Sequence, residues 1–144
     1  MATVELRFSA LPEHVRTARL VAAAVARRAG VDEAVLDEVR LAVGEACSRA
    51  VGLHQSAGIT EPVRVALIED EKQFSIEVGD DAPRSSPGDH APGGAADADV
   101  ETEEDEMGLA VISGLVDDVE VTAGENGGLI RMTWPTTPPG VALT

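Results

Sequence analysis

The sequence predicts an α/β fold in which helices cover one face of a mainly antiparallel β-sheet. Segments with alternating apolar residues come in pairs joined by short turns, which is typical of β-hairpins. Two long segments in the N-terminal half repeat apolar residues at helical spacing, so each has one face to bury against the sheet. We expect a single domain over residues 1–135, followed by an irregular, proline-containing tail over residues 136–144.

The N-terminal part contains one predicted strand and two predicted helices. The alternating segment TVELRFSA predicts the strand. Pro12 and Gly30 are suitable start and stop residues for a first helix over residues 13–29. Asp32 can cap a second helix of about six turns, whose apolar stripe ends at Leu53 before the segment QSAG.

The C-terminal part is predicted to contain two hairpins, separated by a long loop and a short helix. The segments PVRVALIED and QFSIEVGD both alternate and meet at the turn EDEK. Residues 82–106 lack periodicity and combine prolines, glycines and acidic residues, so we expect a mobile, acidic, lid-like loop there. An apolar helix from about Met107, a strand through Val119 and Val121, the turn NGG and the final strand LIRMTW follow.

The charge and the single cysteine limit the classes of partner and compartment. The net charge of −15 repels nucleic acids and anionic membranes, so neither is an expected partner, and basic partners are favoured. Cys47 is the one cysteine and lies among apolar positions, which excludes an intrachain disulfide and indicates a core residue. With no predicted signal peptide and no apolar run long enough to span a bilayer, we expect a cytoplasmic protein.

Two segments, EACSRAV and GLAVISGLVDDVEV, carry the most specific motifs. The first resembles a helix motif Glu-Ala-x-x-Asn-Ala-Val, and the second a glycine before an apolar helix that leads through Asp-x-Val into a strand. With these motifs, residues 4–134 resemble the anti-sigma-factor serine kinases, small bacterial members of the GHKL (histidine kinase-like) ATPase superfamily. The resemblance implies a GHKL-type (Bergerat) two-layer α/β sandwich. It also implies a homodimer that binds a sigma factor, a STAS-domain anti-anti-sigma factor, or both, and that phosphorylates the STAS protein on serine.

The resemblance assigns roles to individual residues. Glu45 matches the catalytic glutamate, and Asp80 in the segment VGDD matches an aspartate that hydrogen-bonds adenine. Gly108 matches a glycine of the phosphate-binding loop. Arg19 matches an arginine of the first helix that contacts partner proteins, and Arg16 lies one turn before it.

Each of these residues also has a simpler interpretation. Glu45 can be a solvated carboxylate, or can pair with Arg49 one turn later for about 0.2–0.5 kcal/mol. Asp80 can cap the loop that follows its strand. Gly108 can serve only as a helix entry, and Arg19 can be an exposed arginine without a binding role.

Four departures from the family pattern fall on nucleotide contacts. Arg49 stands where the family has the asparagine that ligates magnesium, and a guanidinium has no acceptor for a cation, although it could bind a phosphate directly. Ala82 and Arg84 replace glycines after the adenine-binding aspartate, and Glu106 replaces the first glycine before the third helix. We therefore expect degenerate nucleotide-binding motifs, no cofactor, and regulation by protein contact. The alternative is an active serine kinase that uses ATP with magnesium.

Overall fold

The computed structural model describes residues 2–82, 111–116 and 118–136. The predicted acidic loop after Ala82, which includes Arg84 and Glu106, lies outside these residues, as do Gly108 and nearly all of the predicted tail. The elements are β1 (Ala2–Phe8), α1 (Glu13–Ala29), the 3₁₀ turn η1 (Glu33–Val35), α2 (Leu36–Ala57), β2 (Val63–Glu69), β3 (Gln73–Asp80), β4 (Asp118–Gly124) and β5 (Gly127–Pro135). Residues 111–115 form a further stretch of helix.

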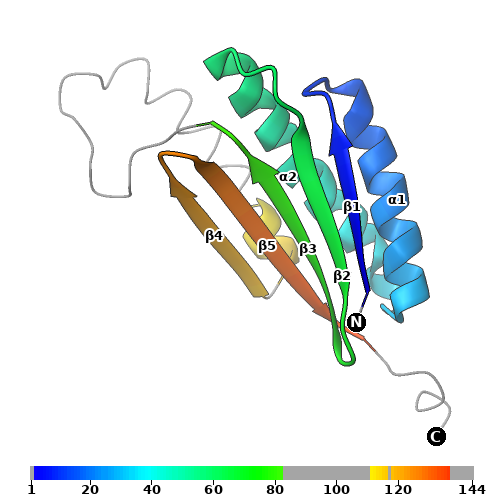
Figure 1. The fold of residues 1–144 in the computed structure, drawn as a ribbon. Helices are drawn as coiled ribbons and strands as arrows, with labels where there is room; N and C mark the ends of the chain where they lie inside the picture. Colours follow the sequence, from blue (N-terminus) through cyan, green and yellow to red (C-terminus); the bar gives the residue numbers. More distant parts are fainter. Residues whose placement is uncertain (1, 83–110, 117, 137–144) are drawn as a thin grey trace, which may run out of the picture.

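The strands form one sheet in the order β1-β2-β3-β5-β4, and every neighbouring pair is antiparallel. Figure 1 shows α1, α2 and the helical residues 111–115 on the same side of this sheet. The other face carries no helix in the described part of the chain. This confirms the predicted antiparallel sheet with helices on one face.

The central strands bury the face that their alternating pattern predicts. The buried residues of these strands on the helix-covered face are Val63, Val65, Leu67, Phe74, Ile76, Val78, Ile130, Met132 and Trp134. The predicted strand through Val119 and Val121 is confirmed as β4, in which Val119 is half-buried and Val121 is 44% exposed. β4 is the edge strand and pairs only with β5, so its helix-side residues have fewer neighbours to cover them.

The two long helices begin and end close to where the sequence predicts. Gly30 adopts a φ of 101° and Gly58 a φ of 68°, left-handed conformations in which both glycines end their helices. The Asp32 side chain accepts a hydrogen bond from the backbone N–H of Ala34 and so caps η1 rather than α2 itself. None of the described helices is both long enough and apolar enough to cross a membrane.

Cys47 lies on the buried face of α2, as predicted for a core residue. Its burial raises the pKa of the thiol to about 12. A thiol with such a pKa stays protonated at neutral pH, and the protonated form is a poor nucleophile. Cys47 is therefore a packing residue of the helix–sheet interface.

Candidate functional site

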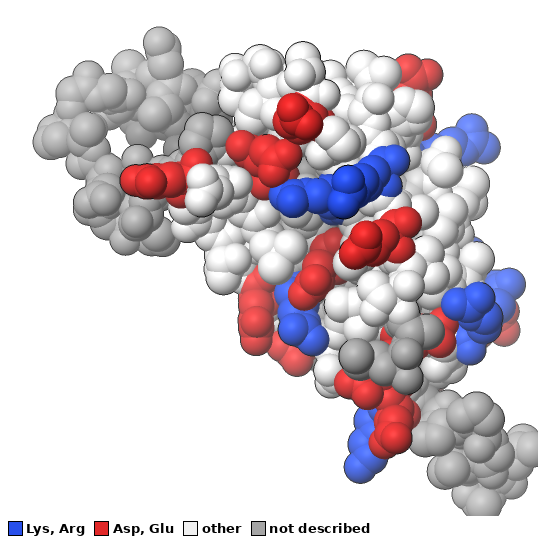
Figure 2. All heavy atoms as spheres, in the orientation of Figure 1, with Lys and Arg blue, Asp and Glu red and all other residues white. Residues whose placement is uncertain are grey.

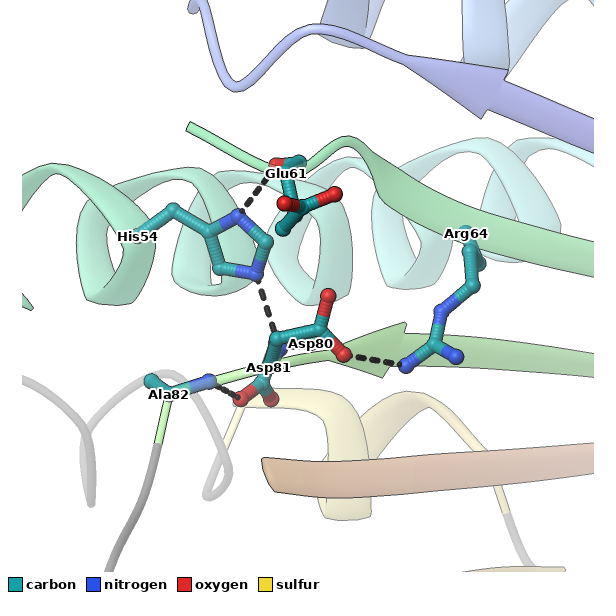
Figure 3. A network of polar contacts seen from close by, with 6 residues as sticks. All are labelled: His54, Glu61, Arg64, Asp80, Asp81 and Ala82. Carbon is teal, nitrogen blue, oxygen red and sulfur yellow. Dashed lines mark hydrogen bonds and ion pairs between the residues drawn. The ribbon is translucent and has the colours of Figure 1, made fainter. Parts of the chain in front are cut away.

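The polar residues that the structure brings together lie where β3 ends beside the C-terminal part of α2 (Figure 3). Asp80 is the last residue of β3 and is only 3% exposed. Its Oδ1 accepts a hydrogen bond of 3.0 Å from the backbone N–H of Ala82. This hydrogen bond is the contact expected if Asp80 caps the loop that follows its strand. Oδ1 of Asp80 is therefore already engaged within the turn.

His54 is the central residue of this network, and it was not among the site residues predicted from the sequence. It is completely buried near the end of α2, whereas Leu53, which was predicted to end the apolar stripe, is only half-buried. His54 Nε2 lies 2.9 Å from the backbone nitrogen of Asp81, and Nδ1 lies 2.9 Å from the carbonyl oxygen of Glu61. Since a backbone N–H can only donate, Nε2 accepts, and Nδ1 carries the proton that it donates to Glu61. The neutral imidazole thus joins α2, the segment before β2 and the end of β3.

The spacing of the buried residues on α2 contained a signal for His54. His54 follows Ala46 by eight residues and Ala50 by four, so it lies on the same buried face of the helix. Leu53 is one position earlier, about 100° away around the helix axis. A polar residue in a buried helical stripe indicates that hydrogen-bond partners will meet it.

Arg64 connects this network to the helix-free face of the sheet. Its guanidinium Nη2 lies 2.8 Å from the Asp81 carboxylate, and both side chains are partly exposed. The guanidinium extends over Gly79 of β3, where an added Cβ would lie 3.4 Å from Nη2. Gly79 therefore leaves the space through which Arg64 reaches Asp81.

The turn between β4 and β5 is seated directly against Asp80. Gly127 has a φ of 118°, and a Cβ at this position would overlap the carbonyl oxygen of Asp80. The same Cβ would lie 2.9 Å from the Cα of Asp81. Only a glycine allows the turn to approach the end of β3 this closely.

Glu45 and Arg49, the pair on α2, are both half-buried. No ion pair between them is found in the described part of the chain, where Arg49 does take part in an interaction. Nor does a hydrogen bond between described residues join Glu45 to His54 or Asp80. The structure therefore places Glu45 on the same helix as His54 but outside the His54–Asp81–Arg64 network.

At two described positions the residues differ in chemistry from the nucleotide contacts of the family pattern, and a third is engaged within the protein. Arg49 presents only donors, one oxygen of Asp80 is engaged by the turn, and the Ala82 side chain is buried where the family pattern has glycine. Among the described residues no group of three or more His, Cys, Asp and Glu side chains is placed to hold a metal ion.

Arg16 and Arg19 are exposed on α1, while Val15, Ala18 and Ala22 of the same helix are buried. The side chain of Arg19 lies across α2, where a Cβ at Gly44 would be 2.9 Å from Arg19 Cδ. The absent side chain of Gly44 thus provides the space for the aliphatic part of Arg19. This helix surface is separate from the His54 network, because α1 contributes no residue to that network.

Comparisons with known proteins agree with this architecture. Residues 8–134 match the family described as histidine kinase-like ATPase domain. The chain is also similar to the crystal structure of the RsbU and RsbW domains of Rv1364c from Mycobacterium tuberculosis, with a TM-score of 0.68 and 16% sequence identity. That similarity covers 96% of this chain and 33% of the other, so this chain spans about a third of its length, and at this identity it shows the fold alone. A comparison with curated protein sequences found no match.

Because the family match extends over nearly the whole described sheet and both long helices, the chain belongs to the histidine kinase-like (GHKL) ATPase domain family.

Proposed function

We propose that this chain is an anti-sigma-factor-like transcription regulator that binds a sigma factor, a STAS-domain anti-anti-sigma factor, or both. Membership in the histidine kinase-like ATPase domain family supports the proposal, as does the shared fold with a structure that contains an RsbW domain. In this proposal the chain works in the cytoplasm as a homodimer. The partner contacts the surface of α1 that carries Arg16 and Arg19.

The observation that carries the proposal is which arginines on α1 form ion pairs and which do not. Arg27 and Arg28 in the last turn of α1 pair with carboxylates, whereas Arg16 and Arg19 form no ion pair with another described residue. Arg19 is further held by its position across Gly44. In a chain with a net charge of −15, an exposed and positioned guanidinium that pairs with no described carboxylate is a rare complement for a partner carboxylate.

Replacing Arg19 with alanine is expected to weaken binding of the partner without unfolding the protein. A charge-assisted hydrogen bond contributes about 1–3 kcal/mol, which corresponds to about a 5- to 150-fold loss of affinity. The partner would first be captured from a cell extract with the parent chain, identified by mass spectrometry and purified. Affinities of the parent and the Arg19→Ala variant for that partner would then be measured by calorimetry.

The matched control is Arg27→Ala, at the other end of the same helix. Arg27 forms an exposed ion pair with Glu33, so its loss is expected to change both stability and partner affinity little. Equal affinity of Arg19→Ala and the parent for the captured partner would exclude Arg19 as a contact residue. A strong drop in the melting temperature of Arg19→Ala would instead assign it a structural role.

The second part of the proposal is that the ATP site has decayed. Arg49 in place of a magnesium ligand, the engaged Asp80 carboxylate and the buried Ala82 support it. The alternative is an active ATP-dependent serine kinase, in which Glu45 would act as the general base. Its half-buried position on α2 leaves the Glu45 carboxylate partly accessible, which is the observation in favour of the alternative.

Calorimetric titration with ATP and magnesium distinguishes these two functions. We expect no saturable binding below millimolar nucleotide, because a donor-only side chain at position 49 cannot complete the coordination of the cation. The variant Arg49→Asn, which restores an acceptor at this position, is expected to bind more tightly than the parent. A dissociation constant in the low micromolar range for the parent chain would rule out a decayed site.

A further inference from the structure

Two arginines face each other on the helix-free side of the sheet. Arg7 of β1 and Arg64 of β2 are direct partners in the antiparallel register, and Leu6 and Val65 beside them point to the helix side. Like charges in directly opposite positions destabilise a pair of strands. Arg64 has the Asp81 carboxylate 2.8 Å away, but Arg7 is exposed and forms no ion pair or hydrogen bond within the described residues. Arg7 thus has no neutralising partner among the described residues, whereas the charge of Arg64 is balanced by Asp81.

A hollow of about 580 Å³ lies beside this pair, bordered by both arginines and by the turn between β4 and β5. Several of its lining residues have little or no side chain, which leaves space above the strands: Ala66, Gly79, Ala123, Gly124, Gly127 and Gly128. Figure 2, which views this face, shows a band of basic side chains with acidic side chains around it. The volume falls in the range of small-molecule sites.

The acidic neighbours limit the kind of anion that fits. Glu5, Glu77, Asp80 and Glu125 also border the hollow, and Glu77 lies 3.9 Å from Arg131 on the same face. A polyanion would be repelled by these carboxylates and by the net charge of −15. A small anion with one or two charges needs only the space between the two guanidinium groups, whose paired N–H donors match a carboxylate or a phosphate.

We propose that this hollow binds a small oxyanion, a carboxylate or phosphate compound, between the guanidinium groups of Arg7 and Arg64. The bound anion neutralises the opposed charges of the two strands. It also competes with the Asp81 carboxylate for Arg64, and the backbone N–H of Asp81 is the group that donates to His54. Binding of the anion on this face of the sheet therefore changes the contacts of Asp81 at the end of β3. Through the hydrogen bond of Asp81 to His54, it also affects α2 on the other side of the sheet. The site uses none of the α1 residues assigned to partner binding.

The test is a titration of the ¹⁵N-labelled full chain followed by NMR. One arm uses sodium phosphate and the other sodium succinate, each at an ionic strength kept constant with sodium chloride. We expect saturable shifts of the backbone amides of Arg7, Arg64 and Asp81 in at least one arm. Comparison of the two arms identifies whether phosphate or carboxylate is preferred.

The variants Arg7→Gln and Arg7→Lys test the assignment. Arg7→Gln is expected to weaken the saturable binding at least ten-fold, while its melting temperature stays unchanged or rises because the repulsion with Arg64 is removed. Arg7→Lys keeps the charge but loses the planar fork, so an intermediate affinity is expected. Arg131→Gln, on the same face, is the control and should bind as the parent does. Non-saturable shifts in both arms, or equal binding by Arg7→Gln and the parent, would overturn the proposal.

Discussion

Replacing Gly127 with alanine is expected to destabilise the protein by more than about 3 kcal/mol, in the upper range of single substitutions. A residue with a side chain is strained at a φ of 118°, and the added Cβ would overlap the carbonyl oxygen of Asp80. The three nearest atoms are backbone atoms of Asp80 and Asp81 at the end of β3, which cannot move aside as a flexible side chain can. The turn must therefore shift away from β3, and the pairing of Asp80 with Gly128 is lost. Urea unfolding followed by circular dichroism measures the effect.

Gly124→Ala is the matched control, because Gly124 lies in the same hairpin and an added Cβ there has no atom within 4 Å. Its φ is not in the left-handed region, so alanine is tolerated and the change should stay within about 1 kcal/mol. If the two alanine variants unfold at the same urea concentration, the close approach of the turn to Asp80 does not contribute to stability.

Much of the fold could be predicted because its signals are local. The strand pattern of Val63, Val65 and Leu67 requires one face of β2 to be buried, whatever that face packs against. The helix end at Gly30 follows from a backbone conformation that glycine adopts at no steric cost. Such elements depend on residues within a few positions of one another, and the structure confirms them.

The candidate site could be predicted less well, because its contacts join residues far apart in the sequence. The segment NGG indicates a turn, but the requirement for glycine at position 127 comes from Asp80, which approaches only through the pairing of β3 with β5. In the sequence, Arg64 and Asp81 are two charged residues with no evident relation. They form an ion pair because β2 and β3 lie side by side in the sheet. His54 likewise reads as a polar interruption of a helix, since its partners Glu61 and Asp81 are supplied by two other segments.

Removal of the His54 side chain is expected to have the second large effect on stability. In His54→Ala the backbone N–H of Asp81 and the carbonyl of Glu61 lose their partner, and an unsatisfied buried group costs about 1–3 kcal/mol. The vacated volume adds a cavity term, so we expect a total loss of about 3–5 kcal/mol in the free energy of unfolding. Denaturant unfolding measures this loss.

His54→Leu separates the two contributions, because leucine fills most of the volume but forms neither hydrogen bond. It is expected to recover the cavity term and to leave a loss of about 2 kcal/mol from the unpaired backbone groups. His14→Ala is the control: this histidine is half-buried on α1 and its ring contacts Phe8 at a centroid distance of 6.2 Å, so its loss should cost about 1 kcal/mol or less.

Hydrogen exchange locates the effect of His54 at the end of β3. In the parent the amide of Asp81 is bonded to a fully buried acceptor and should exchange slowly. In His54→Leu this amide should exchange faster by a larger factor than the amides in the middle of β3, because its acceptor is missing while the ladder of β3 with β2 and β5 is intact. A uniform acceleration across β3 would show that His54 acts through global stability alone. A selective acceleration would assign to His54 the positioning of the Asp80–Asp81 turn, on which both the Asp80–Ala82 hydrogen bond and the Arg64 contact depend.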